Sequence, residues 1–385
     1  MPFTGKATYS AGSSLPEIAD DVSDIVSIVS PYETPLLDHL GDPARAATST
    51  YHEWMEDSLL PNRDTLNDLM LADSVNKTTL AMSNGARFRV GDQVRPHGSG
   101  EIMYVSNVMA NDIIVQRGYG GTTKEALTHG QVFHIIGNAA LEGDDAPVQR
   151  FTNRVRKGNW TQIFTATVRV SGSDQAVRKL AVSDEMDYQK QERLRELLRD
   201  LESTVLCGRA PASTPEGSST VRRSMNGILS MIKTNVFAPG AGDFPSATAL
   251  TEAQLNLAMR RIWENSNAHV DTIVVGGFQK RKINGFIASS ARHIAGSETT
   301  YRDMVSVYES DFGVCRIILA RSMPADCVLL LDSSRVNVMP LTGRNFHFKP
   351  LTTAGDYDAG EVIGEYTVEV RNESAHGLIT GLDMS

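Results

Sequence analysis

Histidine is the side chain most often used for metal binding and proton transfer, and the chain contains nine. His52, His97, His129, His134 and His347 do not follow the H-x-x-x-H or H-E-x-x-H spacings that place two ligands on one helical face, and they form no cluster with cysteine. Isolated histidines of this kind are usually surface or turn residues. The spacing therefore predicts no metal site at these positions.

Adjacent carboxylates could do acid–base chemistry, and two such pairs occur, Asp20 with Asp21 and Asp144 with Asp145. Both pairs lie in polar stretches that supply no partner and no pocket, where a solvated charge is the usual state. The sequence contains no G-x-S-x-G motif of a serine hydrolase. The loop GYGGT at 118–122 lacks the G-x-x-x-x-G-K-[ST] spacing of a phosphate-binding loop. We therefore predict no enzymatic activity and no cofactor.

Composition narrows the class of protein further. At 385 residues the chain is long enough for two or three compact units. A formal net charge of −9 argues against a surface that binds nucleic acid tightly. Cys207, Cys315 and Cys327 lie in apolar or helical runs without paired spacing, which is typical of reduced thiols in a protein that folds in cytoplasm. The sequence shows neither a secretion signal nor an apolar run long enough to span a membrane.

The strongest helical signal in the chain covers 183–206, and a helix of that span would be about 36 Å long. Ser183 or Asp184 can cap its first turn, and Gly208 is predicted to end it in a left-handed conformation. The apolar residues of this segment form one stripe at helical spacing, made of Met186, Leu194, Leu197, Leu198, Leu201 and Val205. One face of this long helix is therefore expected to be buried.

Two alternating segments, 48–60 and 155–170, are predicted to form the legs of a long hairpin. A two-stranded ribbon is only marginally stable in water, so it needs a neighbouring surface. For Trp54 and Trp160 on these legs, an interface role and local packing both remain open. Trp263, on a helix predicted over 251–263, is expected in the core.

Between the legs, four short alternating runs with turn signals predict a small β-barrel or sandwich, at 87–94, 102–109, 112–116 and 131–136. After the long helix, a helical piece at 222–233, helices at 251–263 and 278–288 and several short strands predict helix packed on sheet. The fold class is therefore α+β. The first 41 residues are rich in Gly, Ser, Pro and Thr, and their apolar run contains Ile25, Val26, Ile28 and Val29.

This ordered set of elements resembles the major capsid protein of tailed bacteriophages with the Hong Kong 97 fold, in a subfamily with a β-domain inserted in its E-loop. The resemblance covers nearly the whole chain. The strings that carry it are SPYETPLLDHL from Ser30, EGDDA from Glu142, KGNWTQIF from Lys157, VSGSDQAV from Val170, FQKRKINGF from Phe278, YESDFGVCRIILARSMPADCVLLLD from Tyr308 and GEYTVEVRNESAHGLI from Gly364.

The resemblance implies a division of the chain into the parts of such a subunit. These parts are an N-arm at 1–47, an E-loop at 48–86 and 137–176, an inserted β-domain at 87–136, a peripheral domain at 177–224 with a spine helix at 183–206, an axial domain at 225–341 with a central loop near 289–300, and returning peripheral strands at 342–385.

The implied function is self-assembly into the hexamers and pentamers of an icosahedral head around double-stranded DNA, which is packaged without specific binding. Implied partners are a separate scaffolding protein, a portal at one vertex and a candidate decoration protein. The location is the virion, assembled in the cytoplasm of the bacterial host. Lys77, Lys124 and Lys157 are the lysines available in the hairpin, and no covalent crosslinking is predicted.

Candidate intersubunit contacts come from the arm and the hairpin: Ile25, Val26, Ile28, Val29, Glu53, Trp54, Glu56, Asp57, Arg150, Arg154, Arg156 and Trp160. The acids at 53, 56 and 57 and the arginines at 150, 154 and 156 are proposed as ion pairs between subunits, although a solvated charged ribbon is an equally simple reading. Two other functions remain open. An encapsulin-type compartment would enclose protein, and a cytosolic hydrolase with a β-insertion would stay monomeric or dimeric.

Overall fold

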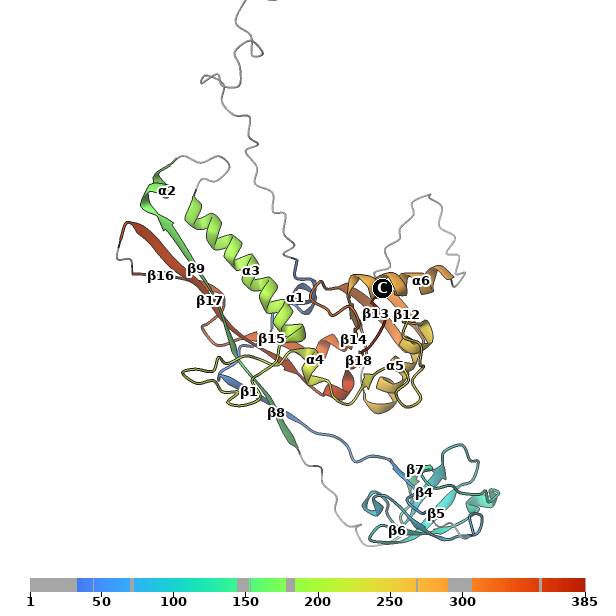
Figure 1. Cartoon of the computed structure of the whole chain (residues 1–385). Helices are drawn as coiled ribbons and strands as arrows, with labels where there is room; N and C mark the ends of the chain where they lie inside the picture. Colours follow the sequence, from blue (N-terminus) through green and yellow to red (C-terminus); the bar gives the residue numbers. More distant parts are fainter. Residues whose placement is uncertain are drawn as a thin grey trace, which may run out of the picture. The chain divides into compact units, whose positions relative to one another are not determined.

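The computed structural model describes residues 33–43, 45–69, 73–143, 152, 154–177, 184–267, 269–289, 307–352 and 355–384. The chain divides into two compact units (Figure 1). The larger unit contains Met1–Trp54 and Arg156–Ser385, and the smaller unit contains Met55–Val155. In these described ranges, no helix is both long enough and apolar enough to cross a membrane.

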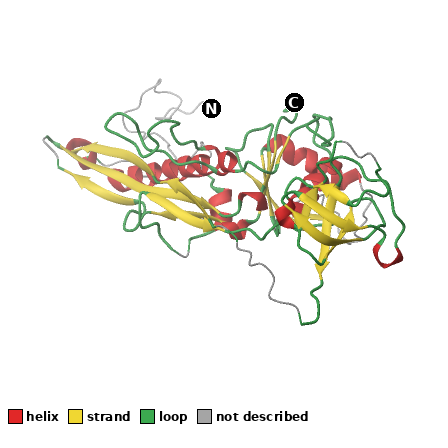
Figure 2. Cartoon of the chain, turned by 90° about the horizontal axis from the view of Figure 1, so that it is seen from below, coloured by secondary structure: helices red, strands yellow, loops and turns green. Residues whose placement is uncertain are grey.

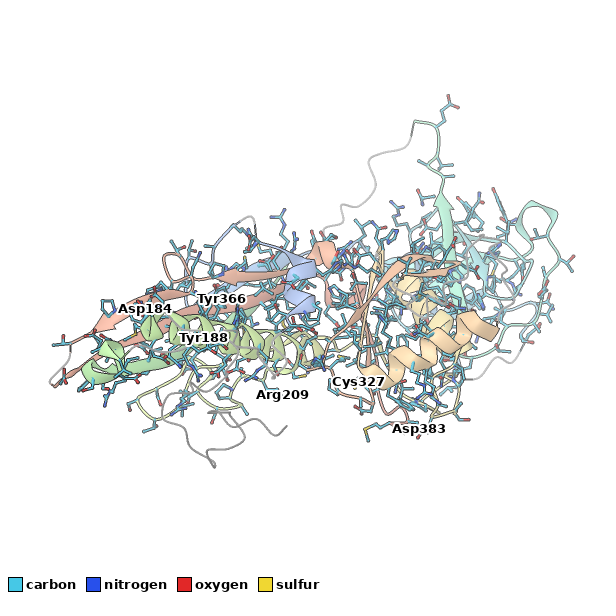
Figure 3. The ribbon with its side chains drawn as sticks, turned by 90° about the horizontal axis from the view of Figure 1, so that it is seen from above. Asp184, Tyr188, Arg209, Cys327, Tyr366 and Asp383 are labelled. Carbon is cyan, nitrogen blue, oxygen red and sulfur yellow. The ribbon has the colours of Figure 1, made fainter. Side chains whose placement is uncertain are left out.

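The long helix α3 spans Glu185–Cys207, as the sequence predicted. The Asp184 side chain caps it by accepting a hydrogen bond from the backbone N–H of Asp187. Figure 3 shows Asp184 and Tyr188 near one end of this helix and Arg209 beyond the other. The prediction for Gly208 was wrong, because its φ is −54°. Glycine is needed there for space, since a Cβ would lie 2.5 Å from the carbonyl oxygen of Thr204.

A four-stranded antiparallel sheet lies against α3 (Figure 2). Its strands are β9 (Gln162–Ser171), β15 (Val336–Pro340), β16 (His347–Leu351) and β17 (Tyr357–Val370). Strand β9 pairs with β17 along its whole length. The predicted hairpin leg 155–170 is therefore split, and only its first part can pair with the leg 48–60. Alternate residues of β9, including Phe164 and Val168, are buried, and α3 covers that face of the strand.

A six-stranded mixed sheet forms the rest of the larger unit. Its order is β10 (Val236–Phe237), β18 (Gly377–Ile379), β14 (Val328–Leu331), β11 (Thr272–Val275), β13 (Gly313–Leu319) and β12 (Val307–Ser310). Helices α5 (Glu252–Asn265) and α6 (Gly277–Ser289) belong to this region, as predicted. The prediction that Trp263 is a core residue was wrong, because its exposed fraction is 62%. The neighbouring Ile262 occupies the buried stripe, and the next position on a helix points about 100° away.

Several shorter elements complete the larger unit. They are α1 (Pro35–Leu40), α2 (Gly172–Ala176), α4 (Ile228–Met231), and the 3₁₀ turns η4 (Ser333–Arg335) and η5 (Glu373–Ala375). The helical piece predicted at 222–233 is thus reduced to the single turn of α4. Leu36 of α1 is fully buried in the same core cluster as Leu201 and Val205 of α3. The end of the N-terminal region is therefore part of the folded core.

The smaller unit is a closed β-barrel. Its strand order is β2 (Arg63–Thr65), β7 (Val132–Asn138), β4 (Asp92–Pro96), β5 (Met103–Met109), β6 (Asp112–Gln116) and β3 (Thr79–Ala81), with turns η2 (Gly85–Arg87) and η3 (Tyr119–Gly121). A bridge between Leu66 and Met82 joins the first strand to the last. Strands β2 and β3 lie outside the predicted range 87–136. Three residues are too few to show an alternating pattern, so the sequence did not reveal them.

Candidate functional site

The described residues contain no group of three or more His, Cys, Asp or Glu side chains placed to hold a metal ion. Buried polar side chains instead attach a two-stranded ribbon to the four-stranded sheet. The ribbon consists of β1 (Tyr51–Glu56) and β8 (Val155–Trp160), which among the described strands pair with each other and with no other. It is the first part of the hairpin that the sequence predicted.

The ribbon brings together several residues that the sequence singled out. Glu53 and Arg156 form a loose ion pair at 3.7 Å, so these two charges meet within one chain. Trp54 is buried, and the Trp160 ring lies against Tyr51 with centroids 4.5 Å apart. Local packing is therefore part of the role of both tryptophans.

The remaining candidate residues have separate places. Glu56 ends β1, and Asp57 accepts a hydrogen bond from the Thr152 hydroxyl at 2.9 Å. Arg154 is exposed just before β8. The candidates Ile25, Val26, Ile28, Val29 and Arg150 lie outside the described residues.

Asn159 fixes the base of the ribbon to the four-stranded sheet. Its side-chain amide donates hydrogen bonds to the carbonyl oxygens of Asn226 and Val368, both at 2.9 Å. Its Oδ1 accepts a hydrogen bond from the backbone N–H of Asn226, also at 2.9 Å. Because Asn159 is almost fully buried, each of these bonds replaces a hydrogen bond to water that folding removes.

A second attachment is the carboxylate of Glu369, on β17, which is fully buried. It accepts hydrogen bonds from His52 of β1 at 2.7 Å and from Arg45 at 2.9 Å, and Arg371 lies 3.3 Å away. Burial alone would raise the pKa of Glu369. The hydrogen bonds from His52 and Arg45 outweigh that effect and hold its pKa below the usual 4.5. The ionised carboxylate therefore ties β1 to the sheet.

Little in the sequence indicated these anchors. Acidic and amide side chains in alternating strands are normally expected to face water. Strand β17 is buried along nearly its whole C-terminal half, so Glu365, Thr367 and Glu369 face protein instead. Which face of a strand is covered depends on its neighbours, and these come from distant parts of the chain.

Replacing Gly158 with alanine is expected to separate the two strands of the ribbon. A Cβ at this position would lie 2.7 Å from the Tyr51 ring and 2.8 Å from the carbonyl oxygen of His52. Overpacking of this kind costs about 1 kcal/mol or more. Hydrogen exchange of the β1 and β8 amides should become faster while that of α3 is unchanged. The matched control is Gly137→Ala on β7, where a Cβ meets no atom within 4 Å. Equal exchange in both variants would contradict the tight packing at Gly158.

Comparison with known proteins identifies the family. A family model described as SU10 major capsid protein matches residues 3–383. No curated protein matches the chain by sequence. Among solved structures, the capsid of a native GTA particle has a TM-score of 0.53 and 10% identity, and the match covers 99% of this chain and 100% of that one.

Two further solved structures are similar at lower TM-scores. That of Microbacterium phage Oxtober96 has a TM-score of 0.48 and 13% identity over 93% of this chain and 95% of that chain. The holo-SrpI encapsulin complex from Synechococcus elongatus PCC 7942 has a TM-score of 0.43 and 11% identity over 61% of this chain and 79% of that chain.

The structural likeness to the GTA capsid shows a capsid fold, and the family match covers almost every residue. Together they confirm the resemblance seen in the sequence. The family is one of structural proteins, so the chain is a structural protein rather than an enzyme in the usual sense. The chain belongs to the SU10 major capsid protein family and is a phage major capsid protein.

Proposed function

We propose that this capsid subunit forms the hexamers and pentamers of an icosahedral head around double-stranded DNA, with its arm and ribbon lying on neighbouring subunits. The ribbon carries the proposal. In the part of the chain that the structure describes, no third strand pairs with it, and it exposes Tyr51, Met55 and Val155. Such a ribbon is marginal alone, and a neighbouring subunit would supply the missing apolar contact.

The parts of the subunit are assigned on the same basis. We place the arm at 1–47, with its docking part before α1, because Leu36 of α1 is buried in this chain's own core. We assign the ribbon and barrel together as the E-loop with its inserted domain, and α3 as the spine helix. The axial domain centres on the six-stranded sheet. That sheet includes β18 from the C-terminal region, whereas β15 pairs with β17. We therefore place the axial domain at 225–335 with 377–384, and the peripheral domain around α3 and the four-stranded sheet.

The proposed partners are further copies of this chain, a separate scaffolding protein, a portal and a decoration protein, and assembly would take place in the host cytoplasm. The excess of acidic side chains keeps packaged DNA from adhering to the shell. On the ribbon, Trp160 and Arg154 are the proposed intersubunit contacts. Purified particles that contain DNA would support this function, and particles that contain only protein cargo would contradict it.

Deletion of residues 1–32 is expected to leave a folded subunit that does not form closed shells. The deletion must end before α1, because Leu36 is fully buried and α1 packs in the core. Thermal unfolding tests the fold, and sedimentation with negative-stain electron microscopy tests assembly. A full-length control with serine at Ile25, Val26, Ile28 and Val29 separates loss of apolar docking from loss of length. Normal shells from the truncated chain would refute the role of the arm.

A further inference from the structure

Glu202 is a buried acid without a cationic partner among the described residues. It lies on α3, and its exposed fraction is 3%. Its Oε2 accepts hydrogen bonds from the backbone N–H groups of Leu36 and Leu37, at 3.1 and 3.3 Å, and so holds the first turn of α1 against α3 (Figure 1). For its Oε1, the described part of the chain supplies no hydrogen bond.

Glu202 also lines a pocket of about 230 Å³. The other lining residues come from the segment before α1, from α3 and from the loop after β13, and they are Glu33, Arg199, Asp200, Ser203, Arg321 and Ser322. Because Oε2 is occupied by α1, Oε1 is the carboxylate oxygen left to face this space. The lining thus combines one buried acid, Glu202, with two serines and four charged residues.

The charges on the rim do not neutralise Glu202. Arg321 lies 3.7 Å from Glu33, and Arg199 lies 3.7 Å from Asp200, and all four side chains are largely exposed. Within each of these two loose pairs the positive and negative charges cancel. Glu202 is then the acid of the lining that has no cationic partner among the described residues. A cation that enters would meet three carboxylates and only two guanidinium groups.

We propose that this pocket binds a basic side chain, lysine or arginine, contributed by a neighbouring copy of this chain in the assembled shell. A buried carboxylate is costly unless a charge or hydrogen bonds compensate it, and an ammonium or guanidinium group supplies both. The volume suits the end of a long side chain, and the hydroxyl oxygens of Ser203 and Ser322 can accept hydrogen bonds from its remaining N–H groups. A neighbouring copy is favoured because a shell places identical chains side by side, so this inference rests on the proposed function.

The site should make assembly depend on pH. Burial raises the pKa of Glu202 to about 7, with Asp38 adding to the effect and the N–H groups of Leu37 and Leu36 opposing it. Only the ionised form of Glu202 attracts a cation, so binding of the cation lowers the pKa of Glu202. A subunit in which Glu202 is protonated therefore releases that proton when the cation binds. Association is therefore strongest above about pH 7 and weakens as pH falls below it. The other charged groups that line the pocket are Glu33, Asp200, Arg199 and Arg321.

The first test uses the full chain with Glu202→Gln. Glutamine keeps an oxygen that accepts from α1, and unchanged thermal unfolding would show that the fold is intact. We expect subunit association to weaken about tenfold above neutral pH, the effect of losing one charge-assisted hydrogen bond, and its pH dependence to disappear. Asp200→Asn, on the exposed rim, is the matched control and should change association much less.

The second test identifies the occupant. A benzophenone probe is attached on the exposed rim at Asp200→Cys in a Cys207→Ser background, since Cys207 is also exposed. After assembly and irradiation, mass spectrometry should find crosslinks to a basic segment of a different copy.

The outcomes separate this inference from the proposed function. Wild-type chain that never forms shells, even with its scaffolding protein present, would overturn the proposed function. If Glu202→Gln subunits form shells with wild-type association strength and wild-type pH dependence, only the proposed role of the pocket would be overturned. Crosslinks confined to the same chain, or made to a different protein, would also overturn it.

Discussion

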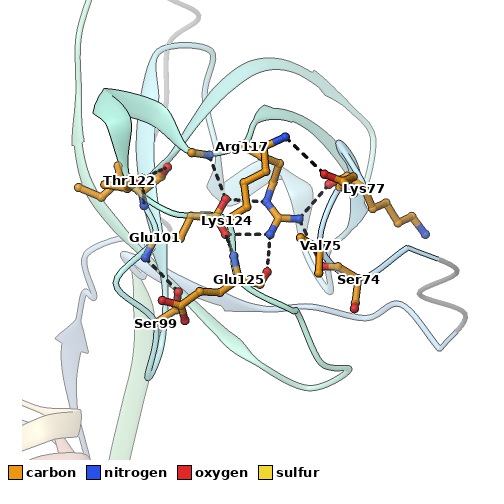
Figure 4. Close-up of polar contacts among 12 residues, drawn as sticks. Ser74, Val75, Lys77, Ser99, Glu101, Arg117, Thr122, Lys124 and Glu125 are labelled. Atoms are coloured by element: carbon orange, nitrogen blue, oxygen red, sulfur yellow. Dashed lines mark hydrogen bonds and ion pairs between the residues drawn. The ribbon is translucent and has the colours of Figure 1, made fainter.

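Glu101→Gln is expected to destabilise the β-barrel unit by about 3 to 5 kcal/mol, because it leaves the buried charge of Arg117 without its partner. Both side chains are almost fully buried. Arg117 donates to both carboxylate oxygens of Glu101, at 2.8 and 2.7 Å, and the backbone N–H groups of Gly118 and Glu125 donate to the same oxygens at 3.0 Å (Figure 4). A neutral amide cannot accept all four bonds.

Arg117 also explains why the effect should spread through the barrel. It donates to the carbonyl oxygens of Ser74, Lys77 and Glu125, and thereby connects the segment before β3 with the loop after η3. Hydrogen exchange of the β4 to β7 amides in the full chain measures the loss of stability of the barrel. Glu125→Gln is the matched control, since its exposed carboxylate accepts one bond from Gly100, and its effect should stay within about 0.5 kcal/mol.

A double variant, Glu101→Leu with Arg117→Met, separates the cost of an unpaired charge from the loss of the pair. Because replacing a whole buried ion pair with apolar side chains is often neutral, we expect it to recover most of the lost stability. A single variant as stable as wild type would contradict the argument. A double variant much less stable than Glu101→Gln would also contradict it.

Glu369→Gln is expected to destabilise the attachment of the ribbon to the sheet by roughly 2 to 3 kcal/mol, because hydrogen bonds to a buried, charged carboxylate are lost. His52 and Arg45 both donate to Oε2 of Glu369, and glutamine offers them one neutral oxygen in place of the carboxylate. Urea unfolding followed by tryptophan fluorescence measures the effect, since Trp54 and Trp160 lie on the ribbon. Glu361→Gln, on the same strand but partly exposed, should have little effect.

The same residue predicts a pH dependence. Its pKa is lowered from 4.5 in the folded protein, so the unfolded chain takes up a proton first as pH falls. The stabilisation from Glu369 is complete well above pH 4.5 and is lost as pH falls through the lower folded value. The variant should lack this part of the acid destabilisation. An unchanged acid limb in Glu369→Gln would show that the carboxylate contributes nothing.

The sequence by itself determined the elements whose signals are local. Periodicity and capping located α3, because an apolar stripe and an Asp at its start act within one helix. Alternation located the ribbon strands and four strands of the barrel. The ordered strings established the family, since their order and spacing do not depend on knowing the contacts.

Tertiary structure alone decided which segments meet. Strand β9 reads as one leg of a hairpin, yet it pairs with β17, which lies nearly two hundred positions later in the chain. Burial of Glu101, Glu202 and Glu369 likewise depends on neighbours that no local pattern specifies. Pairing and burial are set by the free energy of covering surfaces from distant parts of the chain. The sequence therefore located the helices and strands with local signals, and the tertiary structure decided which buried acids connect them.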